Sequence, residues 1–199
     1  CVILVFFIFQ PAFAAGNDAF QSANTLYTLG LFKGTGTNSD GTPVYDLDRA
    51  PSRYEAITML VRLLGKENEA QSGNWNTPFR DVAPWAAPYV GYAYANGLTQ
   101  GTGAAAFGGN ETVMASQYLT FVLRALGYSS ETDFAWNKAW ELSDKLGLTN
   151  REYNGTSHFS RGDIAVISCD ALSQVKKGSD ITLLSSLLAS GAVQSDRVE

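Results

Sequence analysis

The sequence predicts an all-α fold built from three helix-loop-helix repeats that stack into a single unit. The chain has 199 residues, of which 45% are hydrophobic and 17% charged, as expected for a globular protein with a sizeable core. An apolar segment with helical spacing recurs along the chain, and each copy follows a second helical segment that ends in Gly-Leu. A repeat of this size cannot bury the apolar faces of both helices alone, so stacking must supply the core.

The N-terminus predicts export. Residues 2–9 are wholly apolar, and small residues follow at 12–15. This pattern is typical of the end of a secretory signal peptide, and the apolar run is too short for a membrane span, which needs about 20 residues. We expect residues 1–14 to be a signal-peptide fragment and the mature chain to begin near Ala15.

Two stretches match each other at a constant offset, from Val44 to Gly65 and from Ala106 to Gly127. Four identities recur in register, in which Thr58, Arg62, Leu64 and Gly65 correspond to Thr120, Arg124, Leu126 and Gly127. Apolar residues also recur, at 57, 60 and 61 in the first stretch and at 119, 122 and 123 in the second, and this spacing places them on one face of a helix. The final glycine of each stretch occupies a left-handed C-cap position.

A third, weaker copy runs from Phe159 to Leu172. Cys169 takes the position held by Val61 and Leu123 in the other copies. We therefore expect a buried structural thiol and not a nucleophile.

The preceding helices are expected at residues 24–31, 88–98 and 138–148, each ending in Gly-Leu. In the first two copies a Gly-Thr-Gly sequence follows, at 34–36 and 101–103. These glycines follow a helix and lack a subsequent Gly-Lys-Ser/Thr, so they predict turns and not a phosphate-binding loop.

The same pattern divides the chain into segments. Residues 15–66 form repeat 1, residues 67–128 a linker with repeat 2, and residues 129–175 repeat 3, followed by a C-terminal tail at 176–199 with a short helix. Polar stretches at 66–78 and 127–132 are predicted to be linkers, and 181–189 an amphipathic helix.

The starts of two core helices combine a capping box with an arginine. Ser52 and Glu55 have the spacing of a reciprocal cap, and Ser160 and Asp163 offer a shorter version. Arg53 stands between the first pair, and Arg161 holds the same position in repeat 3. A cation at the first helical position opposes the helix dipole, so the helix-start amides and the guanidinium predict an anion site.

These motifs resemble the S-layer homology domain family. The second repeat supplies Phe79-Arg80-Asp81-Val82, Trp85, Gly97-Leu98-Thr99-Gln100-Gly101 and Phe107, and the other two supply the helix-opening motif at 52–55 and 160–163. The resemblance implies a pseudo-threefold helical spindle whose grooves, between neighbouring repeats, bind a secondary cell-wall polymer that often carries a pyruvate ketal. Repeat 2 departs from the pattern, because Met114-Ala115-Ser116-Gln117 lacks both the arginine and the acid.

The residues expected to bind the polysaccharide come from these motifs. They are Arg53, Arg161, Ser52, Glu55, Ser160, Asp163, Asp81, Trp85 and Gly101. The serines and acids have structural capping as their alternative role, and Trp85 has packing as the alternative to stacking on a sugar. Arg53 and Arg161 are expected to dominate binding.

Other classes of function find little support. A net charge of −5 and a pI near 4.9 argue against nucleic acid as a partner. His158 is the only histidine and has no neighbouring metal ligand, so neither a metal site nor a catalytic triad is expected, and the resemblance implies no cofactor. Asp40-Gly41 predicts a turn in preference to a calcium loop, and a carboxylate pair for glycoside hydrolysis stays open.

Three hypotheses of function remain. The first is a secreted, monomeric, non-catalytic anchor that binds cell-wall polysaccharide at the bacterial surface, peripheral to the cell envelope and without a transmembrane span. The second is a surface-layer assembly module that binds no polysaccharide. The third is the anchor fragment of a larger secreted enzyme.

Overall fold

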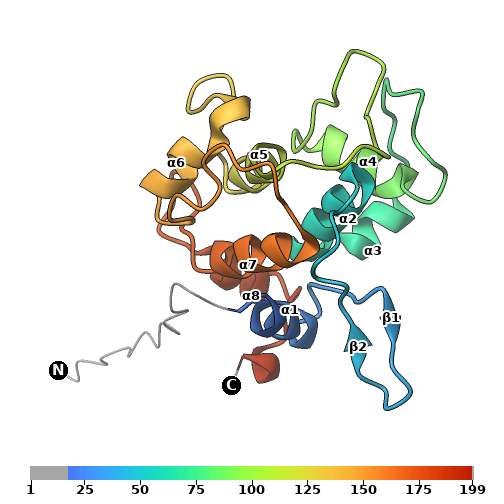
Figure 1. The fold of residues 1–199 in the computed structure, drawn as a ribbon, viewed down its shortest axis with the longest axis vertical. Coiled ribbons are helices and arrows are strands. Elements are labelled where there is room, and N and C mark those ends of the chain that lie inside the picture. The colour runs from blue at the N-terminus through green and yellow to red at the C-terminus, as the bar shows by residue number, and fades with distance from the viewer. Residues whose placement is uncertain (1–17, 199) are drawn as a thin grey trace.

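The computed structural model describes residues 18–198, and within them the fold is all-α, as predicted (Figure 1). The predicted signal-peptide residues 1–14 lie outside this range. The helices and strands are α1 (Ala19–Thr28), β1 (Gly36–Thr37), β2 (Pro43–Val44), α2 (Arg53–Leu63), α3 (Glu67–Ser72), α4 (Ala87–Ala95), α5 (Ala115–Ala125), η1 (Trp136–Lys138), α6 (Ala139–Lys145), α7 (Arg161–Ala171), α8 (Leu183–Ala189) and η2 (Ser195–Arg197).

The first helix of each repeat packs mainly on the second helix of another repeat. Helix α4 packs on α2, α6 packs on α5, and α1 packs on α7, so the contacts run from each repeat to the one before it and close in a ring. The second helices α2, α5 and α7 also contact one another. The division into repeats and the pseudo-threefold symmetry stay predictions, but this cyclic packing explains why the repeats share one core.

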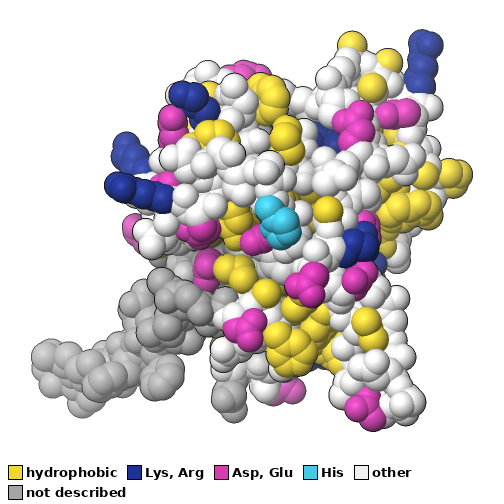
Figure 2. Space-filling view, in the orientation of Figure 1, with side chains coloured by type: hydrophobic (Ala, Val, Ile, Leu, Met, Phe, Trp, Pro, Cys, Tyr) yellow, Lys and Arg dark blue, Asp and Glu magenta, His cyan; other side chains and the backbone are white. Residues whose placement is uncertain are grey.

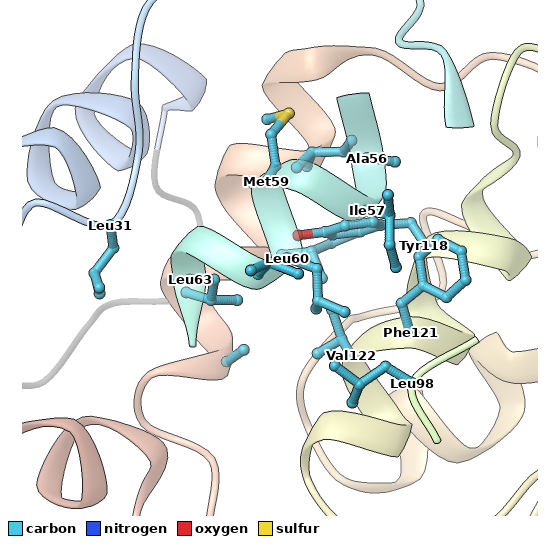
Figure 3. Close-up of a cluster of buried hydrophobic side chains, with 14 of the residues drawn as sticks. Leu31, Ala56, Ile57, Met59, Leu60, Leu63, Leu98, Tyr118, Phe121 and Val122 are labelled. Atoms are coloured by element: carbon cyan, nitrogen blue, oxygen red, sulfur yellow. The ribbon is translucent and has the colours of Figure 1, made fainter. Parts of the chain in front are cut away.

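The core lies where the second helices meet (Figure 3). Ile57 and Leu60 of α2 lie close to Tyr118 and Val122 of α5, and all four are almost fully buried. The Tyr118 hydroxyl forms a hydrogen bond of 2.6 Å with the Ser168 hydroxyl of α7. This bond joins α7 to the contact between α2 and α5. Cys169 is buried and free, as the repeat pattern predicts, and burial is the main cause that raises the pKa of its thiol to about 11.

Local sequence signals account for several helix ends. Ser52 and Glu55 form the predicted reciprocal cap, and Ser160 and Asp163 form the same arrangement at α7. Gly65 and Gly127 follow α2 and α5 with φ of 65° and 93°, which confirms their predicted left-handed conformation.

The connections between helices differ from the prediction in one place. Residues 66–78 are not an irregular linker, because α3 forms within them and buries Ala70 against the core. The Trp75 indole donates to the Ala70 carbonyl at 2.9 Å and packs edge-on to Tyr92, which fixes the end of this segment. The predicted turn at Asp40-Gly41 is present and joins β1 to β2 in a hairpin that projects from the body of the protein (Figure 1).

None of the helices in residues 18–198 has both the length and the apolar character that a membrane crossing requires.

Candidate binding pockets between repeats

Two pockets of similar size, with cavity volumes of about 360 and 350 Å³, lie between repeats. We call them the Arg53 pocket and the Arg161 pocket. The Arg53 pocket is lined by Arg53, Gln100, Gly101, Thr102, Gln117, Thr120, Phe121, Arg124 and Trp136. The Arg161 pocket is lined by Arg161, Lys33, Gly34, Thr35, Ser52, Glu55, Thr58, Met59, Arg62 and Trp85.

The two linings correspond position by position. Thr120, Phe121 and Arg124 on α5 stand where α2 has Thr58, Met59 and Arg62, and the loop residues Gln100-Gly101-Thr102 stand where repeat 1 has Lys33-Gly34-Thr35. Each pocket takes its helix and loop from one repeat, its first-turn arginine from a second repeat and its tryptophan from the third. The two pockets are therefore the same site built twice around the bundle.

Arg53 is buried, with 5% of its surface exposed, and its guanidinium forms few hydrogen bonds. Its Nη2 donates to the Thr99 hydroxyl at 3.4 Å, while its Nε has no partner. The guanidinium lies over the rings of Phe107 and Phe121, at 5.1 and 4.8 Å from their centroids. The pKa of Arg53 is lowered to about 10, and burial is the largest cause of this shift. Arg53 is still charged at neutral pH.

Arg124 supplies the second positive charge of the Arg53 pocket. It donates to the Ser130 hydroxyl at 2.7 Å and to the Leu98 carbonyl at 3.4 Å. Within residues 18–198, no carboxylate lies within ion-pair distance of Arg53 or Arg124. Their mutual repulsion contributes to lowering the pKa of Arg53. Two guanidinium groups without an acidic partner therefore share one cavity.

Arg161 is as buried as Arg53, but its guanidinium has a backbone carbonyl and a carboxylate as partners. Its Nε donates to the Tyr45 carbonyl at 3.1 Å, and its Nη1 lies 3.6 Å from the Glu55 carboxylate and 3.6 Å from the Met59 sulfur. Arg49 also pairs with Glu55, at 2.6 Å. The Arg161 pocket thus contains its own anion.

The helix-start amides are not available to a ligand, so this part of the sequence-based prediction is wrong. The amides of Arg53 and Tyr54 donate to the carbonyls of Glu111 and Gly109, and those of Arg161 and Gly162 donate to Arg49 and Leu47. In both cases a loop of another repeat supplies the carbonyls. The guanidinium groups, and not the helix amides, must provide the donors for an anion.

Two tryptophans line the pockets with exposed indoles. Trp85, a predicted site residue, is 55% exposed and lies at the Arg161 pocket, edge-on to Tyr54. Trp136 is 54% exposed and holds the corresponding position at the Arg53 pocket, where its carbonyl accepts from the Thr120 hydroxyl. Trp136 was not among the residues predicted to bind a ligand.

The remaining predicted residues separate into two groups. Gly101 lines the Arg53 pocket, and Ser52 and Glu55 line the Arg161 pocket. Asp81 lines neither, because its carboxylate accepts from the amides of Phe107 and Gly108 and holds the loop that carries Phe107. These backbone bonds, first that of Phe107, lower the pKa of Asp81.

Ser160 and Asp163 also lie outside both pockets. Ser160 caps α7, and Asp163 lies in its first turn. In the groove on α7 that is equivalent to the two pockets, Ala115 would stand in place of the first-turn arginine. Asp170 would stand in place of Arg62 or Arg124. Tyr153 donates to Asp163 at 3.2 Å. At Asp170 this third position has a carboxylate where each of the two pockets has an arginine.

Asp170 gives this region a measurable pH dependence. Burial, followed by the nearby Glu152, raises the pKa of Asp170 from 3.8 to about 6. Because the folded-state pKa exceeds the unfolded one, its favourable contribution to stability is complete below about pH 4 and is lost as the pH rises through about 6. We expect Asp170→Asn to increase the free energy of unfolding at neutral pH by about 1–3 kcal/mol and to have little effect near pH 4. Urea unfolding at both pH values measures this, and an equal change at both would contradict it.

On the face in Figure 2, Lys and Arg side chains are scattered among acidic ones and form no broad basic patch. This face therefore offers no extended positive surface that would attract an anion at long range.

Comparison with known proteins identifies the chain. The family model described as the S-layer homology domain matches residues 78–113. A "Cell surface protein" of Thermoanaerobacter kivui is 37% identical over 153 residues, which cover 74% of this chain and 19% of that protein. A "Middle cell wall protein" of Brevibacillus brevis is 28% identical over 176 residues, covering 82% of this chain and 16% of that protein, and a "Surface layer protein" of Brevibacillus choshinensis is 27% identical over 172 residues, covering 82% and 15%.

The chain thus spans about a fifth or less of the length of these relatives. The family match falls on repeat 2 and includes Asp81, Trp85, Gly101 and Phe107 of the predicted motif. The chain therefore carries an S-layer homology domain and is similar to proteins named for the bacterial cell surface and cell wall.

Proposed function

We propose that the chain is a non-catalytic anchor that holds a surface protein to the cell wall by binding an anionic wall polysaccharide in the pockets between repeats. The family and the names of the relatives support attachment at the cell wall. The observation that carries the finer proposal is the Arg53 pocket, where two arginines lie without a carboxylate partner.

The physical argument rests on what an anion would add to this pocket. A buried guanidinium without an acidic partner has lost hydration and gained little in return, apart from the aromatic faces of Phe107 and Phe121. A carboxylate between Arg53 and Arg124 supplies the missing acceptors and cancels their repulsion. A charge-assisted hydrogen bond of this kind contributes about 1.5–3 kcal/mol.

The rest of the pocket suits a sugar. The exposed face of Trp136 can stack on the C–H face of a ring, and Gln100, Thr102 and Gln117 offer neutral polar groups for hydroxyls. A pyruvate ketal places a carboxylate directly on a sugar ring, so it matches a pocket that combines cations with an aromatic wall. This is the ligand we propose.

Binding to purified cell-wall sacculi tests the proposal. We expect the folded chain to sediment with sacculi whose polymer carries the ketal, and to lose most of this binding after mild acid removes the ketal. Sacculi from which the polymer has been fully extracted serve as the control for non-specific adsorption. If the chain bound all three preparations equally, or none, the anchor proposal would be wrong and the assembly role would lead.

A further inference from the structure

We propose that the two pockets are unequal, that the Arg53 pocket is the principal anion site, and that Gln117 is the residue that makes it so. This inference rests on the proposed function and specifies which pocket carries it. Gln117 lies three residues into the motif of repeat 2, where repeat 1 has Glu55. Each of the two side chains lines one pocket.

In the Arg161 pocket, every cation of the lining already has an internal carboxylate. Arg161 lies 3.6 Å from Glu55, Arg62 lies 3.0 Å from Glu67, and Lys33 lies 2.6 Å from Glu67. An incoming carboxylate must compete with these groups for donors and is repelled by both acids.

Glu55 keeps its charge throughout the relevant pH range. Its hydrogen bonds from Arg49 are the largest of the causes that lower its pKa to about 2, and Arg161 adds to them. Protonation of Glu55 therefore does not open the Arg161 pocket to an anion at neutral or mildly acidic pH.

None of the described residues that line the Arg53 pocket is acidic. Gln117 replaces Glu55, and Gln100 replaces Lys33. Arg124 holds the position of Arg62 but donates to the Ser130 hydroxyl and the Leu98 carbonyl, which are neutral acceptors. Glu111 stands at the position of Arg49, and its charge opposes the lowering of the pKa of Arg53, yet it lies beyond ion-pair distance and outside the lining.

Gln117 keeps the structural half of the role that Glu55 performs. Its Oε1 accepts from the Met114 amide at 3.0 Å, as the Glu55 carboxylate accepts from the Ser52 amide at 2.8 Å. An amide oxygen thus caps α5 without placing a negative charge beside Arg53. The Arg53 pocket takes Arg53 from repeat 1 and Gln117 from repeat 2. The absence of an acid at position 117 of repeat 2 therefore favours anion binding in this pocket.

The test restores the acid. We expect Gln117→Glu to weaken binding to ketal-bearing sacculi about tenfold, because the new carboxylate occupies the donors of Arg53. Capping of α5 should be preserved, so the urea midpoint should stay close to that of the parent. Gln21→Glu, on the exposed face of α1 and outside both pocket linings, makes the same change in charge and should leave binding unchanged.

A reciprocal variant addresses the other pocket. In a protein whose Arg53 pocket has been disabled by Arg53→Met, Glu55→Gln should recover part of the lost binding by freeing Arg161. Equal binding by the parent, Gln117→Glu and Gln21→Glu would overturn the inference, and so would an equal loss from both Glu variants. Those results leave the anchor proposal standing as long as the parent distinguishes ketal-bearing from ketal-free sacculi.

Discussion

Replacing Arg53 and Arg124 together with methionine is expected to remove nearly all binding to ketal-bearing sacculi. Each guanidinium supplies charge-assisted hydrogen bonds, so each single variant should weaken binding about tenfold to a hundredfold, and the double variant more than either. Arg161→Met should have a smaller effect, because Arg161 already faces Glu55 and donates to the Tyr45 carbonyl. Arg80→Met, at an exposed arginine outside both pockets, is the control.

The stability of the same variants separates a binding role from a structural one. Arg53 is buried with an unpartnered Nε and forms no ion pair in the described chain. The free energy of unfolding of the Arg53→Met variant should therefore lie within about 1 kcal/mol of that of the parent. Arg161→Met removes a donor from the Tyr45 carbonyl and should cost about 1–3 kcal/mol. Sedimentation with sacculi and urea unfolding give the two readouts. If the folded double variant bound sacculi as tightly as the parent, the arginine pocket would not be the binding site.

The features that sequence predicted well are those set by near neighbours in the chain. The caps at Ser52 and Ser160 depend on residues three positions away, and the left-handed glycines at 65 and 127 depend on the end of a single helix. The burial of Cys169 followed from its alignment with two apolar positions. Such signals survive in a single sequence because the physical cause is local.

The make-up of the pockets depends on contacts between repeats, which the motifs do not encode. Arg53, Arg124 and Trp136 come from three different repeats, so their meeting requires the cyclic packing of the helices. For the same reason the helix-start amides were wrongly predicted to hold an anion. The carbonyls that accept from the amides of Arg53 and Tyr54 belong to a loop of another repeat, and no pattern near α2 in the sequence indicates them.

Two further differences have identifiable causes. Helix α3 was missed because Glu67–Ser72 is short and polar, and its only deeply buried residue is Ala70. Asp81 was assigned to the ligand because an acid in a family motif suggests recognition. In the structure it instead fixes the loop before α5 through two backbone amides. The family motif alone does not separate residues that line a pocket, such as Gly101, from residues that position a loop, such as Asp81.

Gly65→Val is expected to be strongly destabilising. Gly65 has φ of 65°, a left-handed conformation that costs a β-branched residue about 1–2 kcal/mol or more. A Cβ at this position would also overlap the Cβ of Ala192, in the segment that follows α8. The helix end cannot move freely, because the Lys66 amide donates to the Val61 carbonyl at 3.0 Å. We therefore expect a loss of about 3 kcal/mol or more, with the C-terminal segment displaced from the core.

Gly97 provides the matched control for Gly65. It follows α4 with φ of 70°, but a Cβ there would meet nothing within 4 Å, so Gly97→Val should show the conformational cost alone. The difference between the two variants in urea unfolding then measures the contact with Ala192. Gly65→Ala combined with Ala192→Gly should recover part of the loss caused by Gly65→Ala alone, because the second change removes the obstructing Cβ. Equal losses from Gly65→Val and Gly97→Val, or no recovery in the double variant, would show that the C-terminal segment does not pack on the end of α2.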